Sequence, residues 1–385
     1  MDQRIQFGVL RAVVYVSSSL REKIKQVLKI LVVTLIAYTS PLAAGSPLGL
    51  PPITIPQNNA QSPKKIALGR LLFHDVRFSA NGTVSCASCH QQAKAFTDGL
   101  PVAQGINRIS GPRNTPTVVN AAFYTSFFLD GRRNSLETQA LDPLVNDIEH
   151  GLENHQEIIK IIRGDKTYGE LFKDVFCIDR NKITIDHVVK SIASYERTLL
   201  AGDSPFDRFF FAGDKGALSK SAARGLNIFR RKGNCANCHE ITWNQALFTD
   251  NRFYNLGIGF TRVNEKLANF VKSLKSIPAD YLGTTKTFFD ENHRSELGRF
   301  MVTGVIRDIG KFRTPTLRNI ERTAPYMHDG SIKNLNEVVE YYNRGGDKNR
   351  FLDPAIFPLH LTDQEKIDLV EFLKALTSPE YTQSP

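Results

Sequence analysis

The chain has 385 residues, of which 41% are hydrophobic and 23% are charged. This length and composition are enough for two ordinary globular domains, each with its own hydrophobic core. The formal net charge of +10 favours an anionic partner surface. However, the basic residues are scattered and form no recognisable nucleic-acid-binding motif, so we exclude nucleic acid as a partner.

The first 45 residues have the order of a secretory signal. Six basic residues come first, followed by an apolar stretch at 30–37 and small residues at 42–45. The apolar stretch is shorter than the roughly 20 residues that a membrane-spanning helix needs. We therefore favour a signal peptide cleaved near Ala44 over an uncleaved N-terminal anchor. Both readings place the rest of the protein beyond the inner membrane, in the periplasm.

The following segments lead into the first chemical motif. Residues 46–63 are rich in proline and polar side chains and are predicted to be a linker. A helix predicted over 64–73 precedes the sequence Cys86-Ala-Ser-Cys89-His90. Two thiols three positions apart can both form bonds to the edge of a porphyrin, and the imidazole of the adjacent His can then coordinate the iron. This is the pattern of covalent c-type haem attachment.

The same arrangement recurs in the second half of the chain. A helix predicted over 219–229 leads into Cys235-Ala-Asn-Cys238-His239. Zinc binding is the main alternative, but it would require Cys-x-x-Cys pairs that act together and would not explain a His directly after both pairs. The sequence therefore predicts two covalently bound haem c groups.

The region between and after the motifs indicates the domain organisation. Residues 184–200 have the apolar spacing of an amphipathic helix, and helix-breaking residues follow. We place the domain boundary there, which gives an N-terminal domain at 64–204 and a C-terminal domain at 205–385. The second domain contains a helix predicted over 362–376. We find no convincing strand pattern, so the expected fold is mainly α, with two cytochrome c-like haem domains.

The second axial ligand of each iron separates electron carriers from peroxide chemistry. The sequence between His90 and His150 contains no further His and no Met. The first iron is therefore predicted to be open to peroxide. For the second iron, the candidate ligands are Met301, Met327 and Tyr342.

Several single residues outside the motifs receive structural roles. Cys177 lies in a mostly apolar setting and is expected to be a buried, inert thiol. Trp243, the only Trp of the chain, is expected to pack against its neighbours. The remaining histidines are read as structural or solvated: His74, His150, His155, His187, His293 and His360.

Five further segments occur in a fixed order around the two motifs. They are Leu72-Phe73-His74-Asp75, Arg113-Asn114-Thr115-Pro116-Thr117, Asp130-Gly131-Arg132, Phe312-Arg313-Thr314-Pro315-Thr316-Leu317-Arg318-Asn319 and Thr323-Ala324-Pro325-Tyr326-Met327-His328-Asp329-Gly330. With them, residues 66–376 resemble the bacterial dihaem cytochrome c peroxidases and, within that group, the MauG-like enzymes. The resemblance implies that the N-terminal haem handles peroxide and that the C-terminal haem receives or stores electrons.

The resemblance also implies a peroxide pocket and a calcium site. Gln139, Pro143 and Glu149 stand at the pocket positions, and Glu149 is the candidate acid/base, because cleaving the O–O bond requires a proton to move between the peroxide oxygens. A lone Glu is ordinarily an exposed carboxylate. One calcium ion between the domains is expected to bind the side-chain oxygen of Asn114 and the backbone carbonyls of Thr323 and Pro325. Without the resemblance, these three residues would be read as a turn.

Three departures from the family pattern bear on the subtype. Ile106 stands where peroxidase members commonly have a His that blocks the first haem, so the first site is expected to be open without activation. Tyr342 stands where those members have a Met, as in the MauG-like enzymes, and a tyrosinate would lower the potential of the second haem. Alternatively, Tyr342 merely packs beside Tyr341. Leu129 replaces a Trp that bridges the haems, which puts charge sharing between them in doubt.

The first functional hypothesis is a periplasmic peroxidase that reduces hydrogen peroxide with electrons from a small cytochrome c or a cupredoxin. The alternative is a MauG-like oxidase that uses peroxide to oxidise residues of a partner protein. A plain electron carrier is the least supported reading. The oligomeric state, monomer or homodimer, and the identity of the donor or protein substrate are left open by the sequence.

Overall fold

The computed structural model describes residues 46–274 and 281–381. The predicted signal peptide or anchor at 1–45 lies outside the described residues. Within the described part of the chain, no helix is long and apolar enough to cross a membrane.

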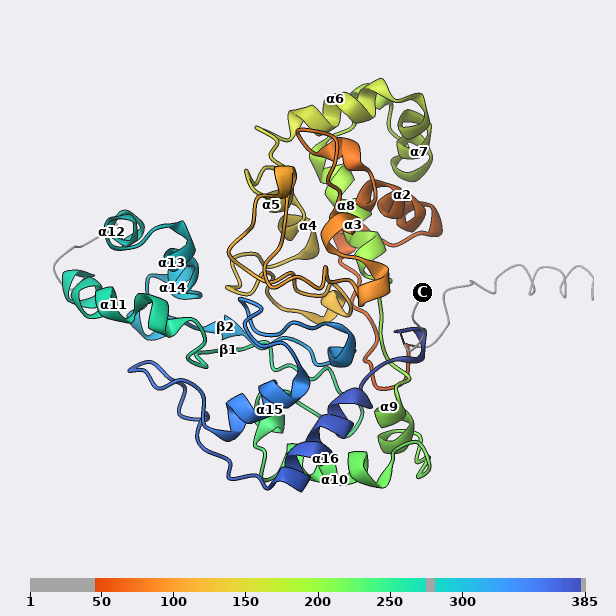
Figure 1. Cartoon of the computed structure of the whole chain (residues 1–385). Coiled ribbons are helices and arrows are strands. Elements are labelled where there is room, and N and C mark those ends of the chain that lie inside the picture. The colour runs from red at the N-terminus through yellow and green to blue at the C-terminus, as the bar shows by residue number, and fades with distance from the viewer. Residues whose placement is uncertain (1–45, 275–280, 382–385) are drawn as a thin grey trace, which may run out of the picture. The chain divides into compact units, whose positions relative to one another are not determined.

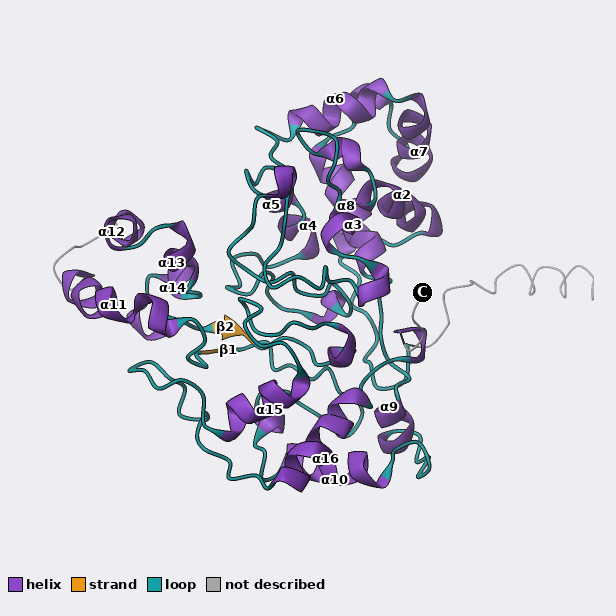
Figure 2. Ribbon diagram, in the orientation of Figure 1, coloured by secondary structure: helices purple, strands orange, loops and turns teal. Residues whose placement is uncertain are grey.

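The described chain consists mainly of α-helices joined by loops and short 3-10 turns (Figure 2), as the sequence predicts. The α-helices are α2 (Pro63–Phe73), α3 (Cys86–Cys89), α4 (Leu136–Gln139), α5 (Leu141–Leu144), α6 (Gln156–Gly164), α7 (Lys166–Phe176), α8 (Ile185–Glu196), α9 (Pro205–Phe210), α10 (Lys220–Arg230), α11 (Phe260–Leu274), α12 (Tyr281–Phe288), α13 (Glu291–Ser295), α14 (Phe300–Thr303), α15 (Leu335–Asn343) and α16 (Asp363–Lys374).

One small sheet was not predicted. It pairs β1 (Phe253–Tyr254) with β2 (Phe312–Arg313) in antiparallel orientation, with Phe253 opposite Arg313. Strands of two residues are too short to give an alternating pattern in the sequence.

The predicted helices begin where a side chain caps the first turn. Ser62 accepts a hydrogen bond from the backbone of α2, Ser219 does the same for α10, and Thr362 caps α16. These caps satisfy backbone N–H groups that have no partner inside the helix. Helix α8 ends at Glu196, four residues earlier than predicted, because Asn120 binds the backbone of the following segment, with its Oδ1 2.9 Å from Ala201 N.

The two halves repeat one helix crossing. Helix α2 packs on α8 at Gly69, and α10 packs on α16 at Gly225 (Figure 1). A Cβ atom at Gly69 would lie 1.9 Å from Ser191 O, and one at Gly225 would lie 2.0 Å from Asp368 O. Because only glycine permits this approach, each pair of helices has the same close contact beside its haem motif.

Each helix pair builds a separate hydrophobic core. The first core ends in sequence at Ala201, and the second begins at Phe206. The predicted domain boundary at 204–205 falls between them. It stays a prediction, since the chain from Ser46 onward folds as one compact unit.

The predicted linker at 46–63 lies against both halves. Leu48 N donates to Asp203 Oδ1 over 2.9 Å, and the carbonyl of Gly49 accepts from Arg318 Nη2 over 3.1 Å. Asn59 is buried and donates to Glu137 Oε1 over 2.7 Å. The segment therefore contributes contacts to both cores.

Helices α11 to α14 form a group of their own beside β1 and β2 (Figure 1). They share a third apolar cluster that includes Phe260, Leu267, Phe270 and Phe300. This group is inserted between the second haem motif and the segment beginning at Phe312.

Candidate active site

The first haem motif forms a single helical turn. Helix α3 carries Cys86 and Cys89, and Ser85 caps it. The Nδ1 atom of His90 lies 3.1 Å from the carbonyl oxygen of Phe96. A carbonyl oxygen only accepts, so Nδ1 carries the proton and Nε2 is left with the lone pair that binds iron.

The second motif is built in the same way. Cys235 begins a 3-10 turn, and the Nδ1 atom of His239 lies 2.9 Å from the carbonyl oxygen of Phe248. In each half, a threonine from a Pro-Thr segment binds the carbonyl one residue before the one that faces the histidine. Thr117 Oγ1 donates to Ala95 O over 2.6 Å, and Thr316 Oγ1 donates to Leu247 O over 2.8 Å.

The protonation state of both histidines suits binding to a metal ion. Burial lowers the pKa of His90 and of His239, so each imidazole is neutral at pH 7. The four motif cysteines are free thiols, as thioether formation requires. Among the described residues, no group of three or more His, Cys, Asp or Glu gathers to hold a metal ion such as zinc.

A cavity of about 260 Å³ adjoins the second motif. Cys235, Cys238 and His239 line it together with Tyr342, and most of the other lining side chains are apolar. A planar apolar macrocycle with a central iron fits this combination: thiols at one edge, a histidine nitrogen, and an apolar wall. The residues present therefore fit a haem.

Tyr342 is one of two predicted second ligands at this cavity. It is half-buried, lines the same cavity as His239 and interacts electrostatically with Cys235 and Cys238. Burial raises its pKa in the absence of a metal. Met327 also lines the cavity, whereas Met301 packs against the cluster of the inserted helices.

The three predicted peroxide-pocket residues lie close together in the sequence, in two short consecutive helices and the loop after them. Gln139 ends α4, Pro143 lies in α5, and the carbonyl of Pro143 accepts from His150 N over 3.3 Å, next to Glu149. Burial raises the pKa of Glu149, while Arg132 opposes this shift. Burial raises the pKa of Cys86 and of Cys89, and the charge of Glu149 adds to both shifts, so Glu149 lies near the first motif.

Ile106 lies directly beside Glu149. Its backbone N donates to Ile148 O over 2.9 Å and to Glu149 O over 3.0 Å, and its side chain is buried. A hydrocarbon side chain cannot bind iron. This position therefore supplies no ligand to the first site.

The three predicted calcium residues line the same cavity, and the calcium site stays a prediction. Asn114, Thr323 and Pro325 all line the cavity at the second motif. The amide nitrogen of Asn114 donates to Leu100 O over 2.8 Å, which leaves its Oδ1 as the atom for a cation. Asn114 N also donates to His328 O over 2.8 Å and so joins the two halves.

Comparison with known proteins adds an independent observation. Residues 63–216 match the model of the family described as di-haem cytochrome c peroxidase. The cytochrome-c peroxidase IdrP1 of Pseudomonas sp. (strain SCT) is 36% identical over 337 residues, which cover 86% of this chain and 85% of the relative. The chain belongs to the di-haem cytochrome c peroxidase family.

Family membership makes the chain an oxidoreductase with two haem c groups. The methylamine utilization protein MauG of Methylorubrum extorquens is also similar, with 35% identity over 83% of this chain and 80% of that protein. Among solved structures, a MauG-like protein associated with microbial copper homeostasis has a TM-score of 0.73 and 31% identity, and the match covers 88% of this chain and 98% of that one.

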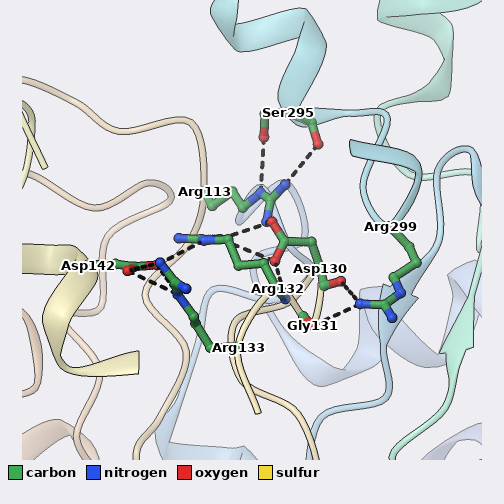
Figure 3. A network of polar contacts seen from close by, with 8 residues as sticks. All are labelled: Arg113, Asp130, Gly131, Arg132, Arg133, Asp142, Ser295 and Arg299. Atoms are coloured by element: carbon green, nitrogen blue, oxygen red, sulfur yellow. Dashed lines mark hydrogen bonds and ion pairs between the residues drawn. The ribbon is translucent and has the colours of Figure 1, made fainter. Parts of the chain in front are cut away.

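Two of the family segments meet in an arginine network (Figure 3). Asp130 Oδ2 accepts from Arg113 over 3.0 Å and from Arg132 over 2.9 Å. Arg113 also reaches Ser295 Oγ over 3.1 Å, and Arg299 donates to the carbonyl of Asp130 over 2.8 Å. The network thus ties the N-terminal half to the inserted helices.

The same network extends to α5, the helix that contains the predicted pocket residue Pro143. Arg133 donates to Asp142 Oδ1 over 2.7 Å on α5, and Arg132 lies 3.6 Å from the same carboxylate. Leu129 lines the cavity of the second motif, and its carbonyl accepts from Arg313 N over 2.8 Å. Leu129 therefore lies at the second site, but it brings no aromatic ring there.

Two expectations about single residues were wrong. Cys177 is exposed, because it is the left-handed residue that ends α7 and its side chain turns away from the core. Trp243 is 87% exposed on a turn closed by Thr242 and Gln245, so it neither packs nor bridges the haems.

Sequence reasoning also missed a buried pair at the second site. His328 Nε2 lies 2.9 Å from Glu296 Oε2, and its ring stacks on Phe312 with centroids 3.8 Å apart. The segment match includes His328, but nothing in the sequence pointed to Glu296, which lies in the insertion. Of the histidines read as structural, His150 is buried and binds Phe78 O over 2.7 Å.

Proposed function

We propose that this protein is a periplasmic dihaem peroxidase that reduces hydrogen peroxide with electrons from a small cytochrome c or a cupredoxin. The net reaction consumes one peroxide, two electrons and two protons and yields two waters. The observation that carries the proposal is the position of Glu149, a carboxyl group near the first haem motif and beside an apolar residue, Ile106, that offers no ligand to iron.

Glu149 is the proton-transfer residue of the proposed site. Burial raises its pKa, so its carboxylate is a stronger base than that of an exposed Glu. It can take a proton from the inner peroxide oxygen and return it to the outer one as the O–O bond breaks. Gln139, the last residue of α4, and Pro143, within α5, are the other residues that we assign to this pocket.

The second site is proposed to pass electrons to the first. When bound, the two haem groups supply the redox chemistry of the reaction. His90 and His239 each offer Nε2 to iron, and Tyr342 is the proposed second ligand at the second site. One calcium ion, held by Asn114, Thr323 and Pro325, would fix the junction between the halves.

A MauG-like oxidase that oxidises residues of a partner protein is the second candidate. The position of Tyr342 beside the second motif favours it, since an anionic oxygen ligand stabilises oxidised iron. The aliphatic Leu129 at the second site, in place of a bridging Trp, argues against it. A plain electron carrier is the least supported, because it gives Glu149 no role.

The experiment that tests the proposal follows donor oxidation. The holoprotein is mixed with a reduced small cytochrome c or cupredoxin and limiting hydrogen peroxide. Two donors oxidised per peroxide, with sustained turnover, is the expected result. A persistent spectral change with poor donor turnover would favour the MauG-like alternative, and no reaction of either haem with peroxide would overturn both.

A further inference from the structure

A second tyrosine lies at the second haem site, apart from Tyr342. Tyr254 belongs to β1 and lines the cavity of that motif. Its hydroxyl donates to Asp250 Oδ2 over 2.6 Å. Cys238, an attachment point of the second haem, lines the same cavity. Tyr254 therefore lies at the second haem site.

The carboxylate partner distinguishes Tyr254 from the other tyrosines near the cavity. Tyr124 accepts a hydrogen bond from Thr316 N over 3.1 Å, and the guanidinium of Arg313 lies 3.5 Å from the centre of its ring. Both contacts disfavour the loss of an electron from that ring. Tyr341 donates only to a backbone carbonyl, Leu256 O, over 2.7 Å.

One other described tyrosine donates to a carboxylate. Tyr168 binds Asp75 Oδ2 over 2.8 Å, but it packs in the first core and Arg77 occupies the same carboxylate. Among the described residues, Tyr254 is thus the only tyrosine that combines a carboxylate acceptor with a place at the second haem site.

The geometry meets the requirement for oxidising a phenol. Removal of an electron makes the hydroxyl strongly acidic, so the proton must leave at the same time. Burial, together with the hydrogen bond to Asp250, raises the pKa of Tyr254, so the proton stays in place until then. Asp250 Oδ1 is held by Arg252 N over 2.9 Å, which aims Oδ2 at the phenol. Asp250 is half-exposed, so it can release the proton to water.

We propose that Tyr254 is a redox-active residue of the second haem site. It gives one electron to the oxidised second haem, while its phenolic proton passes to Asp250. The products are a neutral tyrosyl radical, a protonated Asp250 and a haem reduced by one electron. Peroxide supplies two oxidising equivalents, and one of them is thereby stored on Tyr254 until an electron donor reduces it. The inference rests on the proposed function, because peroxide is the oxidant.

The test is freeze-quench electron paramagnetic resonance of the holoprotein after one equivalent of hydrogen peroxide. We expect a radical signal that narrows when the protein carries ring-deuterated tyrosine, that is absent in Tyr254→Phe and that falls by at least about tenfold in Asp250→Asn. The matched control, Tyr168→Phe, removes the other carboxylate-bound phenol and should leave the signal unchanged. Ferric absorption spectra that match the parent protein show that each variant is folded and carries its haems.

The outcomes separate the two proposals. Peroxide-induced changes in haem absorption without a Tyr254-dependent radical would overturn this inference and leave the proposed function standing. A signal lost in Tyr168→Phe instead would assign the radical to the other tyrosine and also overturn it. No change in haem absorption would overturn the proposed function together with the inference.

Discussion

The Nδ1 atom of His239 lies 2.9 Å from the carbonyl oxygen of Phe248, and His90 has the same relationship to Phe96. The two haem sites are therefore alike on the histidine side. They differ in the residues around them, since Glu149 lies near the first motif and Tyr342 lines the cavity of the second. Substitutions of Glu149 and Tyr342 test this difference between the two sites.

Replacing Glu149 by Gln removes the proposed proton carrier but keeps the size of the side chain. We expect the reaction with peroxide to slow by about a hundredfold or more, which is the usual contribution of a general acid/base. Stopped-flow absorption of the haem bands measures the rate. Glu153→Gln, an exposed neighbour, is the matched control and should react normally. An unchanged rate in Glu149→Gln would remove the residue from the mechanism.

Replacing Tyr342 by Phe removes the proposed oxygen ligand of the second iron. The absorption spectrum of one haem should change, and its midpoint potential should rise by on the order of 100 mV, within the roughly 0.8 V that axial ligands span. Tyr341→Phe is the control, because the hydroxyl of Tyr341 binds Leu256 O and Asp347 N instead. If the spectrum is the same as in the parent protein, Met327 becomes the candidate ligand.

Much of the fold follows from local signals. Ser62, Ser219 and Thr362 each precede an apolar-periodic segment, and each caps a helix in the structure. The inserted helices were not identified, although the spacing of Phe260, Val263, Leu267 and Phe270 in α11 is that of an amphipathic helix. Burial cannot be predicted from the neighbouring residues where tertiary structure decides the direction of a side chain, as for Cys177 and Trp243.

Glu196 makes stability depend on pH. Its side chain is buried beside the first motif, and its Oε2 has no hydrogen-bond partner among the described residues. Burial raises the pKa of Glu196 to about 8 from its ordinary value of 4.5. Because the pKa of Glu196 is higher in the folded state than in the unfolded state, protonation of Glu196 favours the folded state. The contribution of the protonated side chain to the free energy of unfolding is fully present below pH 4.5 and is lost as the pH rises through about 8.

The corresponding measurement is urea unfolding of the holoprotein across this pH range. The free energy of unfolding should fall by on the order of 4 kcal/mol as the pH rises and then level off. Glu196→Gln should flatten this dependence, whereas the exposed Glu170→Gln should preserve it. The same slope in Glu196→Gln and the parent protein would contradict the assignment.

Calcium removal tests the proposed junction between the halves. A bound ion at about a hundred times its dissociation constant stabilises the folded state by about 2.7 kcal/mol, so a chelator should lower the melting temperature. In Asn114→Ala, the melting temperature should be lower already and should not respond to the chelator. The exposed Asn264→Ala should respond like the parent protein. A parent protein that is insensitive to chelation would rule out the calcium site.

The site was only partly readable from the sequence. The spacing of Cys86, Cys89 and His90 is itself the chemical requirement of haem attachment, so it is visible without a structure. The carbonyls of Phe96 and Phe248 are not, because any residue has a backbone oxygen. Partners such as Asp250 for Tyr254 depend on a turn of the chain that brings the two side chains together, and no periodic pattern marks it.

The most direct test of two unlike sites is the electron paramagnetic resonance spectrum of the resting ferric holoprotein. An open first iron and a second iron with two protein ligands predict one high-spin and one low-spin signal in equal amounts. Stoichiometric hydrogen peroxide should then abolish the high-spin signal. Two low-spin signals that do not respond to peroxide would contradict the account.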